Sequence, residues 1–471
     1  MNLKERLGNR LILKTVEQFS KSDEKVISTL ELFERILKDE YAKSNILILK
    51  DAFKNKKPLA KTIKHIFNSL SKNCRNKLIK NLLINNIIVG AKKRSEILKK
   101  EGFKPPFFFV ISPTARCNLN CVGCYAGDYT KKDDLSFGLI DRVLKEAKEL
   151  GIYSTTISGG EPFIRDDIFH IFKKHNEMYF LVYSNGTLIN EKTAKKLSEL
   201  GNIAVAISVE GFEKETNKRR GNGVHKKVLE AMSNLKKYGV LFGFSTTATK
   251  YNSGILASDE FVTYYLRKGC LYGWYFQYLP IGKNPDISLM ATPEQRNRLR
   301  QRVSEMRANK PIFIGDFWND GPNVSGCIAG AREGGYFHII STGDVEPCVF
   351  MHFAVDNIKN KSLKEVMNSD FFKAIRKAQP YCKNKNLLAP CAIIDHPHIL
   401  RGVVKKYNAY PTHPGSECII KDKKITDLLD KNSKRFKEIT DPIWERDYLN
   451  NKNSRWYING KEYHRLCSLK L

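Results

Sequence analysis

The chain has 471 residues, with 80 lysines and arginines against 50 acidic residues, and 42% of its residues are apolar. This length is too great for one hydrophobic core, so two or three domains are expected. No run of 18 apolar residues predicts a transmembrane helix, and the charged N-terminus has no signal-peptide core, so a cytoplasmic protein is expected.

Residues 1–104 are predicted to be helical, because apolar residues recur there at spacings of three and four. Residues 52–100 hold 14 lysines and arginines against one acid, a local charge of +13. Such a charge favours an anionic partner, although solvated basic faces explain it equally well. The amphipathic stretch 77–103 is expected either to lie on an anionic membrane surface or to pack on a neighbouring domain.

From residue 105 the pattern changes to short apolar runs that alternate with helical segments. Buried strands that alternate with helices predict a parallel sheet covered by helices. We therefore expect an α/β core that forms a partial (β/α)6 TIM-like barrel or an open sheet, with ligands at the carboxyl ends of the strands. The predicted strands are 107–114, 154–160, 178–186, 203–211, 240–249 and 274–281.

The β/α rhythm stops near residue 310, where Gly, Cys, Pro and His become frequent. The sequence therefore predicts four regions. These are a basic helical N-terminal region (1–104), a (β/α)6 core (105–310), a small Cys-rich α+β extension (311–425) and a basic C-terminal tail (426–471).

Three cysteines, Cys117, Cys121 and Cys124, follow the first strand in the spacing C-x3-C-x2-C. Clustered cysteines in a reducing compartment bind metal or perform chemistry more often than they form disulfides. A structural zinc site would need a fourth nearby ligand, whereas three cysteines on a [4Fe–4S] cluster leave one iron open to bind a small molecule. The isolated cysteines are interpreted as apolar fillers or free thiols: Cys74, Cys270 and Cys467.

Together with Tyr125, this triplet resembles the signature of radical S-adenosylmethionine (SAM) enzymes over roughly residues 107–310. The resemblance implies that Cys117, Cys121 and Cys124 hold a [4Fe–4S] cluster. It also implies that the fourth iron binds the amino and carboxylate groups of SAM and that Tyr125 lies near the adenine.

The second strand runs into the sequence SGGEP, which contains Gly159, Gly160 and Glu161. Glycines allow the backbone to approach a ligand closely, and a carboxylate can accept from an ammonium group. The segment resembles the one that binds the SAM amino group in this family.

Further positions resemble SAM contacts at the ends of the third and fourth strands. Ser184 and Asn185 match a small polar motif near the ribose, and Ser208 matches a ribose-contacting position. Glu210 stands where relatives often carry Asp, so its role is left open. In the sequence KRRG, Arg220 resembles the arginine that pairs with the SAM carboxylate in this family. Arg220 is favoured over Arg219 because a glycine follows it. The alternative is that the two arginines are a solvated pair with no role in binding.

A second set of cysteines, with the sequence GDVEPC, resembles the SPASM/twitch extension that houses auxiliary [4Fe–4S] clusters. Lys385 and Asp395 stand where the full pattern has cysteines, so one auxiliary [4Fe–4S] cluster is expected, with Asp395 a candidate oxygen ligand and structural zinc the alternative. The candidate ligands are a subset of Cys327, Cys348, Cys382, Cys391 and Cys418.

The resemblance implies an enzyme that reductively cleaves SAM to a 5′-deoxyadenosyl radical and abstracts hydrogen from an unactivated C–H bond. The extension favours a peptide or protein substrate. The basic N-terminal region favours a lipid, with the protein peripheral on the inner face of an anionic membrane. A ferredoxin or flavodoxin is the expected reductant, and a nucleic-acid partner is not expected because no recognised binding fold occurs. The alternative is a non-catalytic iron–sulfur or zinc protein that binds an anionic partner, either a membrane or nucleic acid.

Overall fold

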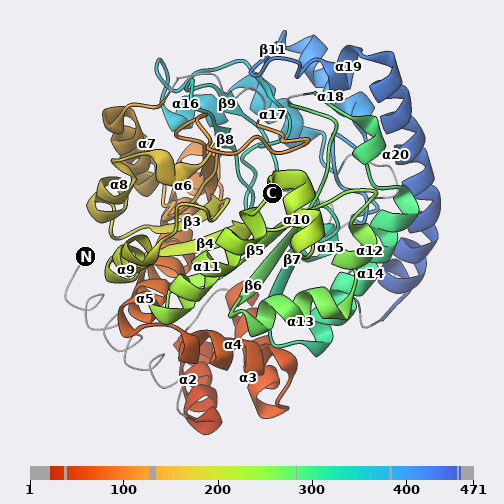
Figure 1. The fold of residues 1–471 in the computed structure, drawn as a ribbon. Coiled ribbons are helices and arrows are strands. Elements are labelled where there is room, and N and C mark those ends of the chain that lie inside the picture. The colour runs from red at the N-terminus through yellow and green to blue at the C-terminus, as the bar shows by residue number, and fades with distance from the viewer. Residues whose placement is uncertain are drawn as a thin grey trace.

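The computed structural model describes residues 22–36, 40–126, 134–282, 284–380, 385–452, 454 and 456–457. Its central feature is a nine-stranded sheet in the order β7-β6-β5-β4-β3-β2-β1-β8-β9, in which only β9 is antiparallel to its neighbour (Figure 1). The strands are β1 (Phe109–Ile111), β2 (Ser154–Ile157), β3 (Tyr179–Ser184), β4 (Ile203–Ser208), β5 (Leu241–Ala248), β6 (Tyr272–Gln277), β7 (Phe313–Asp316), β8 (His338–Ile339) and β9 (Val345–Glu346), and β10 (Phe353–Ala354) pairs with β11 (Tyr410–Pro411).

Helices surround this sheet and account for most of the remaining described chain. In the N-terminal half they are α2 (Asp23–Ile36), α3 (Glu40–Lys54), α4 (Pro58–Ser69), α5 (Lys72–Lys77), η2 (Leu78–Val89), α6 (Gly90–Glu101), α7 (Phe137–Glu149), η3 (Pro162–Ile164), α8 (Ile168–Lys174), α9 (Glu191–Leu200), α10 (Glu213–Arg220) and α11 (Val224–Lys237). In the C-terminal half they are α12 (Ser253–Leu256), α13 (Asp259–Arg267), η4 (Ile287–Leu289), α14 (Pro293–Asn309), α15 (Gly321–Val324), α16 (Leu363–Met367), α17 (Asp370–Lys377), α18 (Pro397–Lys406), α19 (Cys418–Lys421), α20 (Lys423–Trp444) and η5 (Glu445–Leu449).

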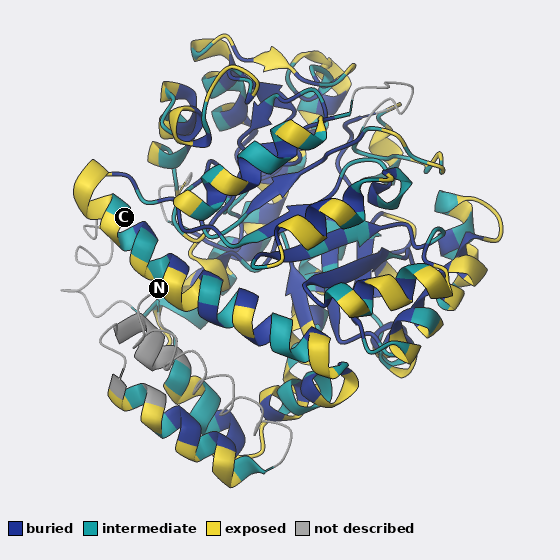
Figure 2. Ribbon diagram, turned by 90° about the vertical axis from the view of Figure 1, so that its left-hand side faces the viewer, coloured by how far each residue is buried: buried dark blue, intermediate teal, exposed yellow. Residues whose placement is uncertain are grey.

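The α/β class and all six predicted strands are confirmed. The sheet does not close into a barrel in the described residues, and it continues beyond residue 310 to a seventh parallel strand, β7. Sequence periodicity missed β7 because its four residues, FIGD, include a glycine and an acid and form no apolar run. The strands are almost wholly buried, and the surrounding helices expose residues on their outer sides (Figure 2).

Local signals account for where several helices begin and end. The side chains of Ser136 and Asn190 accept hydrogen bonds from main-chain N–H groups in the first turns of α7 and α9. Helix α9 ends at Gly201, which takes the left-handed conformation with φ of 73°. These caps fix the lengths of the helices that return the chain to the next parallel strand.

The N-terminal region is helical in its described part, as predicted, and its amphipathic stretch packs on the core. Asn81 donates a 2.9 Å hydrogen bond to the carbonyl oxygen of Met178, and Lys93 donates a 2.9 Å bond to that of Lys148. The guanidinium of Arg94, which is buried, donates to the carbonyl oxygen of Gly151. Part of the basic charge of residues 52–100 therefore binds the protein's own backbone. Within the described residues, no helix is both long and apolar enough to cross a bilayer.

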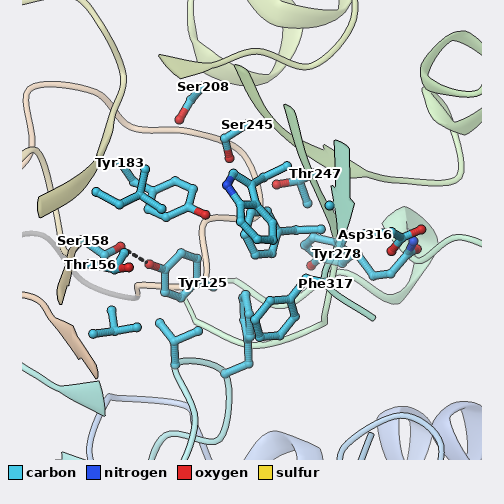
Figure 3. Close-up of a pocket in the computed structure, with 18 of the residues that line it drawn as sticks. Tyr125, Thr156, Ser158, Tyr183, Ser208, Ser245, Thr247, Tyr278, Asp316 and Phe317 are labelled. Carbon is cyan, nitrogen blue, oxygen red and sulfur yellow. Dashed lines mark hydrogen bonds between the residues drawn. The ribbon is translucent and has the colours of Figure 1, made fainter. Parts of the chain in front are cut away.

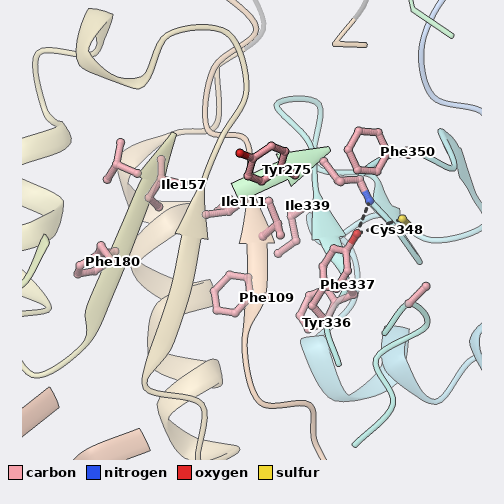
Figure 4. Packing of buried hydrophobic residues seen from close by; sticks show 14 of the residues in the cluster. Phe109, Ile111, Ile157, Phe180, Tyr275, Tyr336, Phe337, Ile339, Cys348 and Phe350 are labelled. Carbon is pink, nitrogen blue, oxygen red and sulfur yellow. Dashed lines mark hydrogen bonds between the residues drawn. The ribbon is translucent and has the colours of Figure 1, made fainter. Parts of the chain in front are cut away.

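The Cys-rich extension joins the sheet of the core directly. Strand β8 pairs in parallel with β1, and the hairpin β8–β9 forms the edge of the sheet. The rings of Phe109 and Phe337 stack with centroids 5.4 Å apart, and those of Phe108 and Tyr336 stack at 5.3 Å (Figure 4). This shared apolar seam places the extension immediately beside the first strand of the core.

The region beyond residue 426, which the sequence suggests is a basic tail, begins as an ordered helix. Asp422 caps α20, which packs along α14, and Trp444 near its end is buried against Leu387 and Leu388. Residues 458–471 lie outside the described residues.

Candidate active site

A cavity of about 670 Å³ runs along one face of the sheet to the carboxyl ends of its strands. Polar side chains from successive strands face it, including Ser158 after β2, Ser208 on β4 and Thr247 on β5 (Figure 3). The side chains that the sequence selects as SAM contacts come from the same strand ends. The parallel arrangement therefore gathers them at one cavity, as expected for an α/β sheet.

The three clustered cysteines all line this cavity on the loop after β1. The main-chain N–H of Leu119 lies 3.5 Å from the sulfur of Cys117, and the side-chain amide of Asn185 lies 3.9 Å from it. Burial raises the pKa of the Cys117 thiol to about 11 and also raises that of Cys121. Metal binding at these sulfurs would therefore have to displace protons, and the nearby N–H donors suit the thiolates that result.

The spacing of the three sulfurs distinguishes a cluster from a single ion. Among the described residues, the group of three potential ligands whose atoms all lie within 4.8 Å of one another is Glu346, His352 and His413, not the cysteine triplet. The cysteines are thus spread more widely than the ligands of one tetrahedral zinc. Their arrangement fits a [4Fe–4S] cluster, whose cysteines bind separate irons.

Gly159 and Gly160 allow the cysteine loop to approach β2. A Cβ atom on Gly160 would lie 1.9 Å from the carbonyl oxygen of Arg116, and one on Gly159 would lie 2.4 Å from that of Thr114. The main-chain N–H of Gly160 donates to the carbonyl oxygen of Thr114 at 2.9 Å, and the main-chain N–H of Glu161 donates to that of Arg116 at 2.8 Å. The glycines are therefore required for backbone packing as well as for any approach to a ligand.

Glu161 lies behind the cavity and is not among the residues that line it. Its fully buried carboxylate accepts from the hydroxyl of Ser184 at 2.9 Å and from the main-chain N–H of Asn185 at 2.8 Å. Burial raises the pKa of Glu161 to about 7, although these hydrogen bonds oppose the shift. In this structure Glu161 positions the end of β3, while Ser184 and Asn185 face the cavity.

Glu210, whose role the sequence left open, connects two arginines beside the cysteine loop. Its buried carboxylate pairs with Arg219 and with Arg220 at 2.6 Å each. Arg219 also donates to the carbonyl oxygen of Val122 at 3.1 Å, whereas a nitrogen of Arg220 lies 4.0 Å from the sulfur of Cys121. Both arginines line the cavity, so the alternative of a solvated pair is wrong.

Tyr125 extends from the cysteine loop toward β2 and the extension. Its hydroxyl lies 2.7 Å from that of Ser158, and its ring contacts Phe350 at a centroid distance of 5.2 Å and stacks on His352 at 6.2 Å (Figure 3). Tyr125 therefore lies where core and extension meet.

Three of the second set of cysteines come together in the extension. Burial raises the pKa of Cys348 above its ordinary value and that of Cys391 to about 12. The three thiols are close enough that the charges of Cys327 and Cys391 add to the first shift and the charge of Cys327 adds to the second. Cys418 lies elsewhere, with its sulfur 3.3 Å from the carbonyl oxygen of Pro280. Cys382, like the isolated Cys467, lies outside the described residues.

Asp395, the candidate oxygen ligand, is paired with an arginine in this structure. Its buried carboxylate binds the guanidinium of Arg296 at 2.6 and 3.2 Å and accepts the main-chain N–H of Cys391 at 3.0 Å. Breaking a buried ion pair of this kind leaves an uncompensated charge. Asp395 therefore acts as the counter-ion of Arg296.

An aromatic wall on the side of the cavity toward β6 and β7 was missed by the sequence analysis. Its members are distant in sequence and individually resemble ordinary core residues, so no local signal identifies them. They are Trp274, Phe276, Phe313, Phe317, Tyr336 and Phe350.

Comparison with known protein families assigns two parts of the chain. Residues 111–251 match the model of the radical SAM superfamily, and residues 327–392 match the SPASM model, an iron–sulfur cluster-binding domain. The first region contains the three clustered cysteines, and the second contains Cys327, Cys348, Cys382 and Cys391.

Three curated relatives illustrate the range of similar proteins. An uncharacterized protein of Methanocaldococcus jannaschii is 32% identical over 44% of this chain and 72% of its own length. An AdoMet-dependent heme synthase of Methanosarcina barkeri is 26% identical over 59% of this chain and 88% of its own. The mycofactocin maturase MftC of Mycobacterium tuberculosis is 25% identical over 68% of this chain and 84% of its own.

The fold also resembles that of a solved structure, Streptococcus suis SuiB bound to the precursor peptide SuiA. The match has a TM-score of 0.50 at 19% sequence identity and covers 61% of this chain and 71% of SuiB. At this identity the likeness concerns the fold.

We predict that Gly160→Ala loses the cluster of Cys117, Cys121 and Cys124 while the protein stays folded. The added methyl group would overlap the carbonyl oxygen of Arg116 and force the cysteine loop away from β2. Iron content and SAM cleavage after anaerobic purification measure this effect. Gly138→Ala on α7, where a Cβ has no atom within 4 Å, is the matched control and should keep its full iron content. Equal iron in the two variants would contradict this explanation.

We predict that the stability difference between the wild type and Glu161→Gln depends on pH. The folded pKa of about 7 exceeds the ordinary value of 4.5, so the stabilisation from protonated Glu161 is complete below pH 4.5 and is lost as pH rises through 7. Between about pH 5.5 and 8 the wild type should lose roughly 2 kcal/mol of unfolding free energy relative to the variant. Anaerobic urea unfolding of both proteins measures this, and a pH-independent difference would rule the assignment out.

Proposed function

Because the chain belongs to the radical SAM superfamily and carries the SPASM extension, we propose that it abstracts hydrogen from an unactivated C–H bond of a peptide or protein side chain. When bound, the [4Fe–4S] cluster and SAM supply a 5′-deoxyadenosyl radical by one-electron cleavage of SAM. The observation that carries the proposal is that the cavity lined by the first set of cysteines comes within one side chain of the second set. Cys117, Cys121 and Cys124 line it directly, and Tyr336, which also lines it, has its hydroxyl 3.0 Å from the sulfur of Cys348 (Figure 4).

The proposed roles of the residues follow from this arrangement. Cys117, Cys121 and Cys124 hold the SAM-binding cluster, and Glu210 fixes Arg220 for the SAM carboxylate. The remaining proposed SAM contacts all face the cavity: Tyr125, Gly159, Gly160, Ser184, Asn185 and Ser208. Glu161 is the exception, since it supports Ser184 and Asn185 from behind.

The chemistry of the cavity favours an uncharged target group. The arginines among its described lining residues, Arg219, Arg220 and Arg307, are each paired with Glu210 or Asp320, and no lysine lines it. Two arginines share Glu210, so one positive charge is in excess there, and we assign it to the SAM carboxylate through Arg220. A phospholipid headgroup or the propionates of a tetrapyrrole would need further cations, which the described lining does not supply. An apolar or aromatic peptide side chain instead matches the aromatic wall and excludes water from the radical.

Among the similar proteins, MftC is a maturase and SuiB binds a precursor peptide, which supports a peptide substrate. Heme synthases are also similar, so a tetrapyrrole is the competing outcome of the test. We further propose that Cys327, Cys348 and Cys391, with one further ligand such as Cys382, would hold one auxiliary [4Fe–4S] cluster, which would supply an electron acceptor near the cavity. A ferredoxin or flavodoxin is the proposed reductant.

A lipid substrate and a peripheral membrane location remain secondary proposals. Exposed apolar side chains at Ile87, Ile88 and Val89 lie near basic residues of the N-terminal region and support contact with an anionic surface. The cavity itself offers no unpaired cation for a lipid headgroup among its described residues.

Deuterium transfer tests the substrate class directly. Reduced holoenzyme and SAM are incubated separately with fully deuterated peptides from a proteome digest, with deuterated phospholipids and with deuterated Fe-coproporphyrin. Mass spectrometry should find 5′-deoxyadenosine carrying one deuterium in the peptide reaction alone. Label that appears with the lipid or the porphyrin instead would refute the peptide proposal.

We predict that the two cysteine sets separate cleavage of SAM from product formation. Cys121→Ala should lose about four irons per chain and all SAM cleavage, and Cys348→Ala should also lose about four irons but retain SAM cleavage without product, because each cubane holds four irons. Iron analysis and quantification of 5′-deoxyadenosine distinguish the variants. Cys270→Ala, at a buried isolated cysteine, is the control for thiol loss. SAM cleavage at the wild-type rate by both cluster variants would show that the assignment is wrong.

A further inference from the structure

A buried group of ligating side chains that the iron–sulfur chemistry does not use lies where three segments of the extension meet. Glu346 ends β9, His352 immediately precedes β10, and His413 follows β11. Glu346 and His352 are fully buried, and His413 is mostly buried. The ligand atoms of all three side chains lie within 4.8 Å of one another.

The spacing within this group matches that around a single metal ion. The Oε1 atom of Glu346 lies 3.3 Å from Nδ1 of His352 and 3.6 Å from Nδ1 of His413. Metal–ligand bonds of 2.0–2.1 Å at tetrahedral angles separate ligand atoms by about 3.4 Å. The two rings lie with centroids 4.3 Å apart, tilted by 50°, so both nitrogens can address one point.

Hydrogen bonds from neighbouring residues hold the Glu346 carboxylate in the orientation that a metal ligand needs. The Oε2 atom of Glu346 is 2.7 Å from Nδ1 of His338, whose Nε2 is 2.7 Å from the hydroxyl of Ser112 at the end of β1. The hydroxyl of Thr412 donates to Oε1 and lies 3.1 Å from Nδ1 of His413. Supporting hydrogen bonds of this kind are typical around metal-binding carboxylates.

The hydrogen bonds of His352 within the protein do not explain why its side chain is buried here or why its backbone is strained. Its Nε2 is buried and has no hydrogen-bond partner, and its backbone adopts the left-handed conformation with φ of 52°. Both features cost free energy. The 3.3 Å hydrogen bond between its Nδ1 and Glu346 is long, so it stabilises this arrangement only weakly. The ring is thus held with Nδ1 toward Glu346, while Nε2 is left buried without a hydrogen bond.

We propose that Glu346, His352 and His413 form a mononuclear site for a divalent transition-metal ion, with Zn²⁺ as the best-matched cation. Two imidazoles and one carboxylate are the ligand set of three-ligand zinc sites, which keep a fourth position for water, and they also suit Fe²⁺ in sites with open positions. Zn²⁺ is favoured because the ligand atoms have the separations of tetrahedral geometry. The ion joins β9, β10 and β11 into one unit. Because His352 stacks on Tyr125, the site supports the cysteine loop from the side of the extension.

Metal analysis of the holoenzyme tests the site without reference to activity. The protein is expressed with added zinc, purified anaerobically and analysed for zinc and iron, and its zinc coordination is measured by X-ray absorption at the zinc edge. About one zinc per chain is expected, with nitrogen and oxygen ligands at 2.0–2.1 Å and no sulfur shell near 2.3 Å. Absence of zinc, or a sulfur shell from zinc bound at the cysteines, overturns the proposal.

Substitutions of the proposed ligands test whether these residues bind the zinc ion. Glu346→Gln preserves side-chain volume and His413→Asn changes the least buried ligand, and each should lower zinc occupancy at least tenfold while iron content stays at the wild-type level. His398→Asn, at an exposed histidine on α18, should retain zinc. Wild-type zinc occupancy in both ligand variants would overturn the proposal, as would equal loss of zinc in the His398 control.

Discussion

The close backbone contact between the cysteine loop and the segment after β2 is the constraint on which the site depends. The loop follows a strand of only three residues, so its own secondary structure does little to hold it. Two main-chain hydrogen bonds to the carbonyls of Thr114 and Arg116 hold it instead, at a separation that leaves no room for a side chain on Gly160. This contact anchors the start of the loop just before Cys117, and Arg219 anchors its middle by hydrogen bonds with the main chain of Val122.

A second constraint is the pairing of β8 with β1. An auxiliary cluster domain connected only by a linker could move relative to the core, but this extension adds strands to the same sheet and stacks aromatic rings on β1. Tyr336 both faces the cavity and contacts Cys348, so the second cysteine set lies one side chain away from the cavity that the first set lines. Hydrogen abstraction and a later electron transfer can therefore involve one bound substrate.

Buried charge in this site is paired locally. Glu210 pairs with two arginines beside the cysteine loop, which leaves one positive charge there, and Asp395 balances Arg296 beside Cys391. Each arginine among the described lining residues of the cavity has an acidic partner. The strong net charge of the chain is thus a property of its surface and of its N-terminal region rather than of the cavity. For this reason total charge predicts little about the substrate that enters the cavity.

The sequence by itself determined the six core strands, the cysteine triplet and the strand-end residues proposed to contact SAM, because these depend on local periodicity and on spacings within one loop. Only the tertiary structure decided that Glu161 lies behind the cavity, that Asp395 is paired with Arg296, that a seventh strand and the extension complete the sheet, and that distant aromatic residues form one wall. Those features depend on contacts between residues far apart in the chain, where burial and ion pairing are set by the packing of whole elements and leave no local pattern.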